Sequence, residues 1–189
     1  HYALASMETA QRRYAMAEAS LRKAIELAPK QPQAHILLSS VLAALDRGDE
    51  GLSHLEQVVN QYPTEVPLRT SYARLLVSEQ QFEAALEQFR ELHAQREEDA
   101  EITYGYAMLA TQQEQWPVAR ELWQTLRSDH KYTPEATYFL AQVEEFEENE
   151  VLAIGLYNSV SRGELRVDAA IRAANLIAKR GDLLRAREK

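Results

Sequence analysis

Residues 71–92 read SYARLLVSEQQFEAALEQFREL, and they decide the fold. The small residues Ala73 and Ala85 stand among large apolar ones such as Tyr72 and Phe89. Apolar spacings of three and four place side chains on one face of a helix. We therefore expect two helices, with their backbones close together at the two alanines.

This pattern recurs along the whole chain with a period of 34 residues, shortened to 33 at its last step. One series of small residues comprises Ala17, Gly51, Ala85, Ala119, Ala153 and Ala186. A second comprises Ala5, Ser39, Ala73, Ala107, Ala141 and Ala174. Turn signals separate the segments, among them Gly48–Asp49, Gly181–Asp182 and several prolines. No alternating strand pattern occurs, so the sequence predicts an all-α protein with two helices per repeat.

Composition excludes several classes of protein. The chain has 189 residues, no Cys and a formal net charge of −8. Without cysteine there can be no disulfide, thiolate metal site or Cys nucleophile. The acidic balance argues against a nucleic-acid binder, and no apolar run reaches the length of a membrane helix.

The repeat resembles the tetratricopeptide repeat (TPR) family. Residues 71–92 match its helix–turn–helix unit best, and AEASLRKAIELAP at residues 17–29 carries it again. The resemblance implies a right-handed superhelical solenoid. We expect one solenoid domain over residues 1–189, as a fragment of a longer protein. Its repeats are expected at 1–31, 32–65, 66–99, 100–133 and 134–166, with a partial repeat at 167–189.

The resemblance also implies where a partner binds, because the first helix of each TPR repeat lines a concave groove. The residues of this chain at the groove positions of the family are partly apolar and aromatic, which suits contact with a peptide or a helical segment of another protein. The alternative is that these side chains pack against neighbouring helices. The predicted partner-binding residues are Ile36, Ser40, Thr70, Arg74, Tyr104, Met108, Tyr138, Gln142, Phe146 and Ile171.

A TPR subclass that clamps terminal carboxylates needs Lys and Asn at two positions where this chain has Tyr2 and Ser6, or Ile36 and Ser40. We therefore expect no such clamp. Arg74 is the one groove cation of the middle repeats, and it could pair with a partner carboxylate.

The sequence predicts no catalytic residue, metal site or cofactor. The histidines fall at different places of different repeats, so we expect them to lie apart on the surface. Carboxylates cluster at Glu144, Glu145, Glu147 and Glu148. They are either a solvated helix end or an acidic patch that steers a basic partner.

The expected function is a non-catalytic scaffold or adaptor that binds another protein, with no nucleic acid and no membrane insertion by this chain. Residues 71–89 and 136–157 resemble the middle repeats of TPR lipoproteins of Gram-negative outer membranes. That resemblance implies a bacterial periplasmic adaptor presenting substrates to a processing protease, with the cytoplasm as the alternative location. A second alternative is a structural segment that self-associates through uncapped ends.

Overall fold

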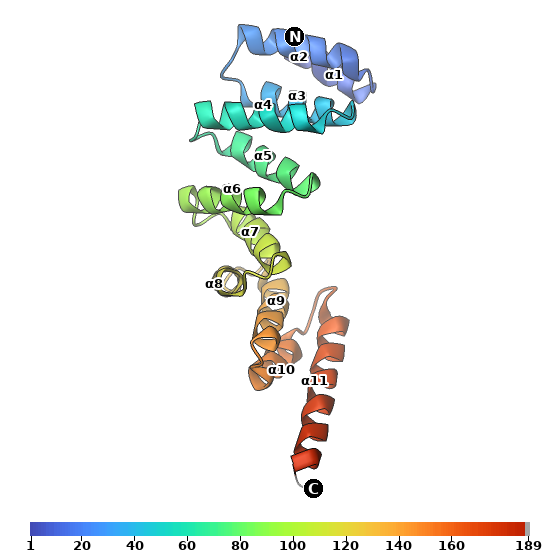
Figure 1. Ribbon diagram of the computed structural model, residues 1–189, viewed down its shortest axis with the longest axis vertical. Coiled ribbons are helices and arrows are strands. Elements are labelled where there is room, and N and C mark those ends of the chain that lie inside the picture. Colours follow the sequence, from blue (N-terminus) through green and yellow to red (C-terminus); the bar gives the residue numbers. More distant parts are fainter. Residues whose placement is uncertain (188–189) are drawn as a thin grey trace. The chain divides into compact units, whose positions relative to one another are not determined.

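A computed structural model describes the backbone of residues 1–187 and the side chains of residues 1–181. Over this range the chain is all-α (Figure 1). The helices are α1 (Tyr2–Ala10), α2 (Tyr14–Leu27), α3 (Pro32–Ala44), α4 (Gly48–Gln61), α5 (Val66–Ser78), α6 (Phe82–Gln95), α7 (Ala100–Gln112), α8 (Trp116–Leu126), α9 (Thr133–Phe146), α10 (Glu150–Ser159) and α11 (Arg166–Arg187).

The helices form pairs, and each pair is joined by the same tight turn. The helices α3, α5 and α7 begin at Pro32, Val66 and Ala100, the first residues of the predicted second, third and fourth repeats. In every pair the turn contains a non-glycine residue with positive φ, between 54° and 61°. These residues are Arg12, Asp46, Gln80, Glu114 and Glu148, spaced 34 apart. Left-handed backbone closes the first helix and redirects the chain into the second.

Two compact units divide the chain, His1–Ala94 and Gln95–Lys189. In the first unit the small residues of the repeat are fully buried, for example Ala17 and Ala73, and they let paired helices approach. Leu21, Leu38 and Leu42 fill the space beside them. Gly51 stands where other repeats have alanine because a Cβ there would lie 3.0 Å from the Ser39 carbonyl oxygen.

The core of the second unit is built around two aromatic side chains. Trp123 is fully buried, stacks on Phe139 with ring centroids 4.8 Å apart, and donates its indole hydrogen to Thr111 Oγ1 at 2.8 Å. Tyr157 is also buried, and it packs edge-on against Tyr138. Burying large rings while satisfying their polar atoms gives this unit a specific core.

Two prolines and two glycines stand inside helices where the sequence predicted connections, and one of them, Gly48, is the first residue of α4. Pro32 and Pro67 occupy the first turns of α3 and α5, where a missing backbone donor costs nothing. The predicted turn at Gly181–Asp182 is wrong, because α11 continues through both residues to Arg187. A Cβ at Gly181 would meet no atom within 4 Å, and a single helical glycine costs only about 1 kcal/mol. Within the described residues, no helix is long and apolar enough to cross a membrane.

Candidate functional site

In the first unit, three predicted partner-binding residues line one open concavity of about 360 Å³ between α3 and α5. These are Ile36, Ser40 and Arg74, whereas Thr70 is half-buried and is not part of the lining. The rest of the wall is mainly hydroxyl and aliphatic, from Ser39, Leu55, Ser71, Leu75 and Ser78. The structure thus brings together an apolar side chain, hydroxyl groups and a guanidinium.

The charge of this concavity comes from Arg74. The other arginine of α5, Arg69, is buried and donates to Gln88 Oε1 at 2.7 Å and to the Pro63 carbonyl. Arg74 is exposed and makes no ion pair or side-chain hydrogen bond within the described part of the chain. A partner carboxylate could therefore approach it without displacing an existing partner.

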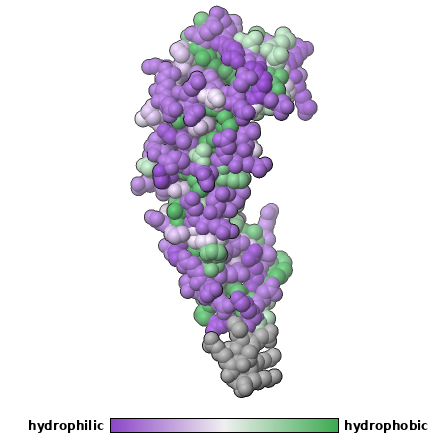
Figure 2. Space-filling view, viewed as in Figure 1, coloured by the Kyte–Doolittle hydropathy of each residue, from purple (hydrophilic) through white to green (hydrophobic). Residues whose placement is uncertain are grey.

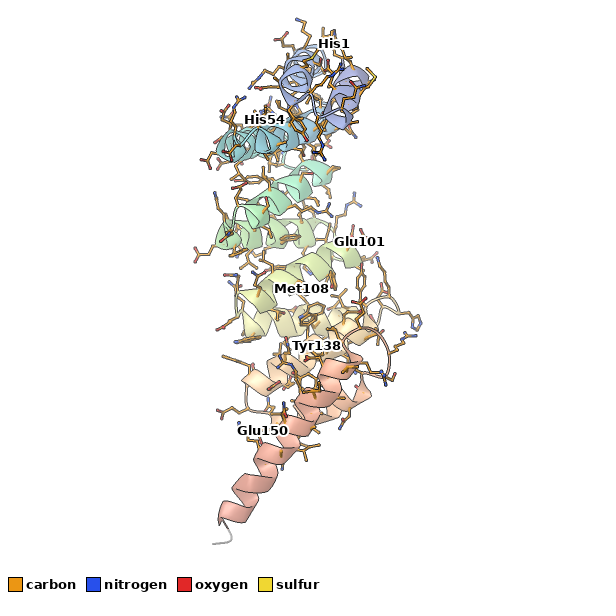
Figure 3. The ribbon with its side chains drawn as sticks, turned by 90° about the vertical axis from the view of Figure 1, so that its right-hand side faces the viewer. His1, His54, Glu101, Met108, Tyr138 and Glu150 are labelled. Carbon is orange, nitrogen blue, oxygen red and sulfur yellow. The ribbon has the colours of Figure 1, made fainter. Side chains whose placement is uncertain are left out.

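In the second unit, some of the predicted partner-binding residues on α7 and α9 are buried and others are exposed. Tyr138 is buried, with only 4% of its surface exposed, and Tyr104 is half-buried and stacks on Tyr132. Met108 and Phe146 are exposed, and Phe146 stacks on Trp116 with ring centroids 4.4 Å apart. Figure 3 shows Met108 on α7 and Tyr138 close to α11. Tyr138 follows the alternative of packing against neighbouring helices, because α10 and α11 bring Tyr157 and Arg172 against its ring.

Tyr138 belongs to a polar network that joins α9 to α11. Its hydroxyl donates to Asp168 Oδ2 and accepts from Gln142 Nε2 at 3.1 Å. Arg172 donates to Asp168 at 3.0 Å and to Glu145 at 3.3 Å. Charge-assisted bonds of this kind hold the helices in register. Asp168 and Arg172 were missed as site residues, although their spacing of four on one helix was the available signal.

The network shifts the pKa values of its members. Burial, reinforced by the Asp168 carboxylate, raises the pKa of Tyr138. Burial and the Glu145 carboxylate raise the pKa of Tyr157, whose hydroxyl donates to Glu145 Oε2 at 2.6 Å. The bond from Tyr138 keeps the pKa of Asp168 below its usual value. The two phenols therefore stay protonated donors and Asp168 stays a charged acceptor at neutral pH.

The predicted acidic patch is largely paired in the structure. Arg120 donates to Glu144 Oε1 at 3.0 Å and also to Glu147, and Arg172 reaches Glu145. Glu144 is buried, contrary to the expectation of a solvated helix end, because α8 packs on α9 and brings Arg120 to it. Of the four carboxylates, only Glu148 has no ion pair within the described residues.

The remaining predicted residue, Ile171, lies on α11. It lines an open groove of about 620 Å³ between α10 and α11, together with Tyr157, Val160 and Val167. Val167 and Ile171 are both more than half exposed. The groove gives this end of the second unit an apolar surface that the sequence analysis identified only at Ile171.

Two histidines correct the expectation that the imidazoles lie apart. His35 of α3 and His54 of α4 stack in the first unit, and the ring of His35 is buried (His54 is labelled in Figure 3). Sequence position hides this contact, because the two residues occupy different repeat positions on two helices that pack together. Among the described residues, no cluster of three or more His, Cys, Asp or Glu side chains could hold a metal ion.

The chain is similar in fold to several solved structures, two of which are described as tetratricopeptide repeat proteins. A tetratricopeptide repeat protein from Parabacteroides merdae matches 97% of this chain and 77% of its own, with 17% identity and a TM-score of 0.71. YrrB, a TPR protein described as having an unusual peptide-binding site, matches all of this chain and 90% of its own, with 16% identity and a TM-score of 0.66. Yeast Tom70 matches 95% of this chain at 20% identity and a TM-score of 0.66, and this chain spans only 39% of Tom70.

Sequence comparison assigns the family. No curated protein sequence matches the chain significantly. Two family models, both described as tetratricopeptide repeat, match residues 8–75 and 73–122. Repeats of this kind are generally protein–protein interaction scaffolds and are typically non-catalytic. Because the two models together cover more than half of the residues, and the helix pairs repeat along both units, the chain belongs to the tetratricopeptide repeat family.

Proposed function

We propose that this protein is a non-catalytic adaptor that binds a segment of another protein on the first-helix faces of its repeats. The observation that carries the proposal is the α3–α5 concavity, where Ile36, Ser40 and Arg74 meet on one open surface. An exposed, unpaired guanidinium beside an apolar side chain suits a segment with a carboxylate next to an apolar residue. The peptide-binding site named for YrrB, a protein of similar fold, is consistent with this use of the repeats.

In the second unit the exposed side chains are the ones available for contact. Met108 and Phe146 offer an adaptable thioether and an aromatic ring, both suited to irregular apolar surfaces. Tyr138, Gln142 and Glu145 instead support α11 through the polar network. We therefore assign partner contact to Ile36, Ser40, Arg74, Met108, Phe146 and Ile171, and a positioning role to Tyr138 and Gln142.

A peptide-display selection with the full chain as bait tests the proposal. We expect enriched peptides to place Asp or Glu near an apolar residue. The Arg74→Glu variant should lose those peptides and select Lys or Arg at the same place, because the charge at the concavity is reversed. The matched control is Arg90→Glu, an exposed arginine on α6 outside the concavity, which should select the original peptides. Identical peptides from wild type and Arg74→Glu would contradict the proposed site.

The finer role, a periplasmic adaptor that presents substrates to a processing protease, is supported by the resemblance of residues 71–89 and 136–157 to outer-membrane TPR lipoproteins. Its test is the sequence of the full-length gene. A leader ending in a lipidated cysteine would support it, and a cytosolic start would contradict it.

A further inference from the structure

The imidazoles of His35 on α3 and His54 on α4 approach each other through one ring nitrogen each. Nδ1 of His35 lies 3.0 Å from Nε2 of His54. Two nitrogen ligands at about 2.1 Å from one metal ion lie about 3.0 Å apart when their bonds meet at a right angle, and about 3.4 Å apart at a tetrahedral angle. The separation therefore matches two neighbouring positions of a tetragonal site, the geometry that Cu²⁺ and Ni²⁺ favour.

His35 is held in the orientation that a metal ligand needs. Its Nε2 atom lies 2.9 Å from the Pro29 carbonyl oxygen, so this nitrogen carries the hydrogen and Nδ1 keeps its lone pair. Metal-binding histidines characteristically donate from their second nitrogen to a carbonyl or a carboxylate, which fixes the tautomer and the ring. Only 5% of His35 is exposed, so packing adds to this restraint. His35 thus presents a fixed nitrogen towards His54.

His54 is the adjustable member of the pair, because it is half-buried. Burial, aided by His35 and Arg22, lowers the pKa of His54 to about 4. The ring is therefore neutral near pH 7 and need not lose a proton to bind a cation. Its Nδ1 atom makes no hydrogen bond to a described residue, so the one ring hydrogen can stand on Nδ1 and leave a lone pair on Nε2.

An open cavity of about 340 Å³ beside His54 gives water access to the pair. Asp49 lines this cavity, is exposed and forms no ion pair with a described residue. Arg22 lines it too, but its charge is paired with Glu18 at 2.8 Å. Figure 2 shows mainly hydrophilic side chains at the surface around α4 on the side that it displays. These surroundings suit a hydrated cation.

The third repeat shows that the fold does not require imidazoles at these two places. Arg69 and Gln88 stand 34 residues after the two histidines, and Arg69 donates to Gln88 Oε1 at 2.7 Å and to the Pro63 carbonyl. Pro63 in turn stands 34 residues after Pro29. The same contact is thus made by an arginine, which has no lone pair for a metal ion. The second repeat instead has two side chains that suit transition metals.

We propose that His35 and His54 bind one divalent transition-metal ion of tetragonal preference, Cu²⁺ or Ni²⁺. His35 Nδ1 and His54 Nε2 are the protein ligands, and water molecules complete the coordination from the cavity. His54 exchanges its hydrogen from Nε2 to Nδ1 through solvent, so no net proton is released. No third His, Cys, Asp or Glu among the described residues joins the pair, so loss of either ligand should abolish binding.

The test is isothermal titration calorimetry of the full chain with the chlorides of nickel, copper and zinc at pH 7. Every sample carries His1→Ala, which removes an exposed imidazole at the start of the chain. We expect saturable binding of one Ni²⁺ or Cu²⁺ per chain, and weaker binding of Zn²⁺ than of Cu²⁺. Electron paramagnetic resonance of the Cu²⁺ sample should show two coupled imidazole nitrogens.

Matched variants separate metal binding from the structural contact. His54→Gln should lose saturable binding, although its amide can still donate to His35. The double variant His35→Arg with His54→Gln transfers the pair of the third repeat into the second, so it should stay folded by circular dichroism and bind no metal. His130→Gln changes an exposed histidine of the second unit and should bind like the parent. Arg74→Glu should also bind metal normally, so failure of the partner site and failure of the metal site remain distinguishable.

Three results would overturn the proposal. The first is a parent chain that shows no saturable binding of Ni²⁺ or Cu²⁺. The second is undiminished binding by folded His54→Gln, which would place the ion elsewhere. The third is a Cu²⁺ spectrum with fewer than two imidazole nitrogens, which would show that the two rings do not share one ion.

Discussion

The Nδ1 atom of His35 lies 3.0 Å from Nε2 of His54, and the two rings stack with centroids 5.1 Å apart. The other nitrogen of His35, Nε2, lies 2.9 Å from the Pro29 carbonyl oxygen. A carbonyl can only accept, so His35 Nε2 carries a hydrogen, and in that tautomer its Nδ1 accepts one from His54 Nε2. The pair links the loop after α2 to α3 and α4.

The histidine pair makes the first unit sensitive to mild acid. Burial, aided by His35 and Arg22, lowers the pKa of His54 from 6.5 to about 4. Between these values the unfolded chain binds a proton that the folded chain does not. The free energy of unfolding should therefore fall as the pH drops from about 6.5 to 4, by at most about 3 kcal/mol.

Denaturant titrations over this pH range measure the effect. His54→Gln is the control, because its amide can still donate to His35 but does not titrate. Its stability should depend less on pH over the same interval. Parallel pH dependences of wild type and His54→Gln would show that the pair does not couple to folding.

The buried carboxylate Glu144 depends on Arg120. Arg120→Ala should lower the free energy of unfolding by about 2–4 kcal/mol, because it leaves Glu144 buried without its cation. Adding Glu144→Leu should restore most of this loss, since Leu42 and Leu76 occupy the same repeat position in other repeats. A double variant as unstable as Arg120→Ala alone would mean that the loss came from arginine packing rather than from the unpaired charge.

The turns within the helix pairs store backbone strain that glycine can remove. Gln80 has φ of 59°, a conformation that costs a non-glycine residue about 1 kcal/mol. Gln80→Gly should therefore stabilise the protein by up to about 1 kcal/mol in thermal or chemical denaturation. The neighbouring Glu79 has φ of −87°, so Glu79→Gly should destabilise instead. The same sign of change for both variants would contradict this reading of the turn.

Exposure separates variants that probe binding from those that damage the fold. Tyr138 is buried in the α9–α11 network, so Tyr138→Ala should cost about 3–5 kcal/mol of stability. Phe146 is more than half exposed and rests on Trp116, so Phe146→Ala should cost about 1 kcal/mol. Equal melting temperatures for the two variants would show that Tyr138 is not a structural residue.

The sequence by itself was enough to predict the all-α class and two helices per repeat. Small residues such as Ala73 and Ala85 must recur at a fixed period, because each close approach of two helices leaves room for no larger side chain. Arg74 was identified as a groove cation by the resemblance to the repeat family rather than by the local pattern.

Tertiary structure alone decided which of the predicted partner-binding residues are accessible. Tyr138 and Phe146 look alike in the sequence, yet one is buried under α11 and the other is exposed. The repeat period could not predict the contact of His35 with His54 or that of Glu144 with Arg120 either. Such contacts form between helices whose residues occupy different repeat positions, and their partners are set by how the helices pack rather than by spacing along one helix.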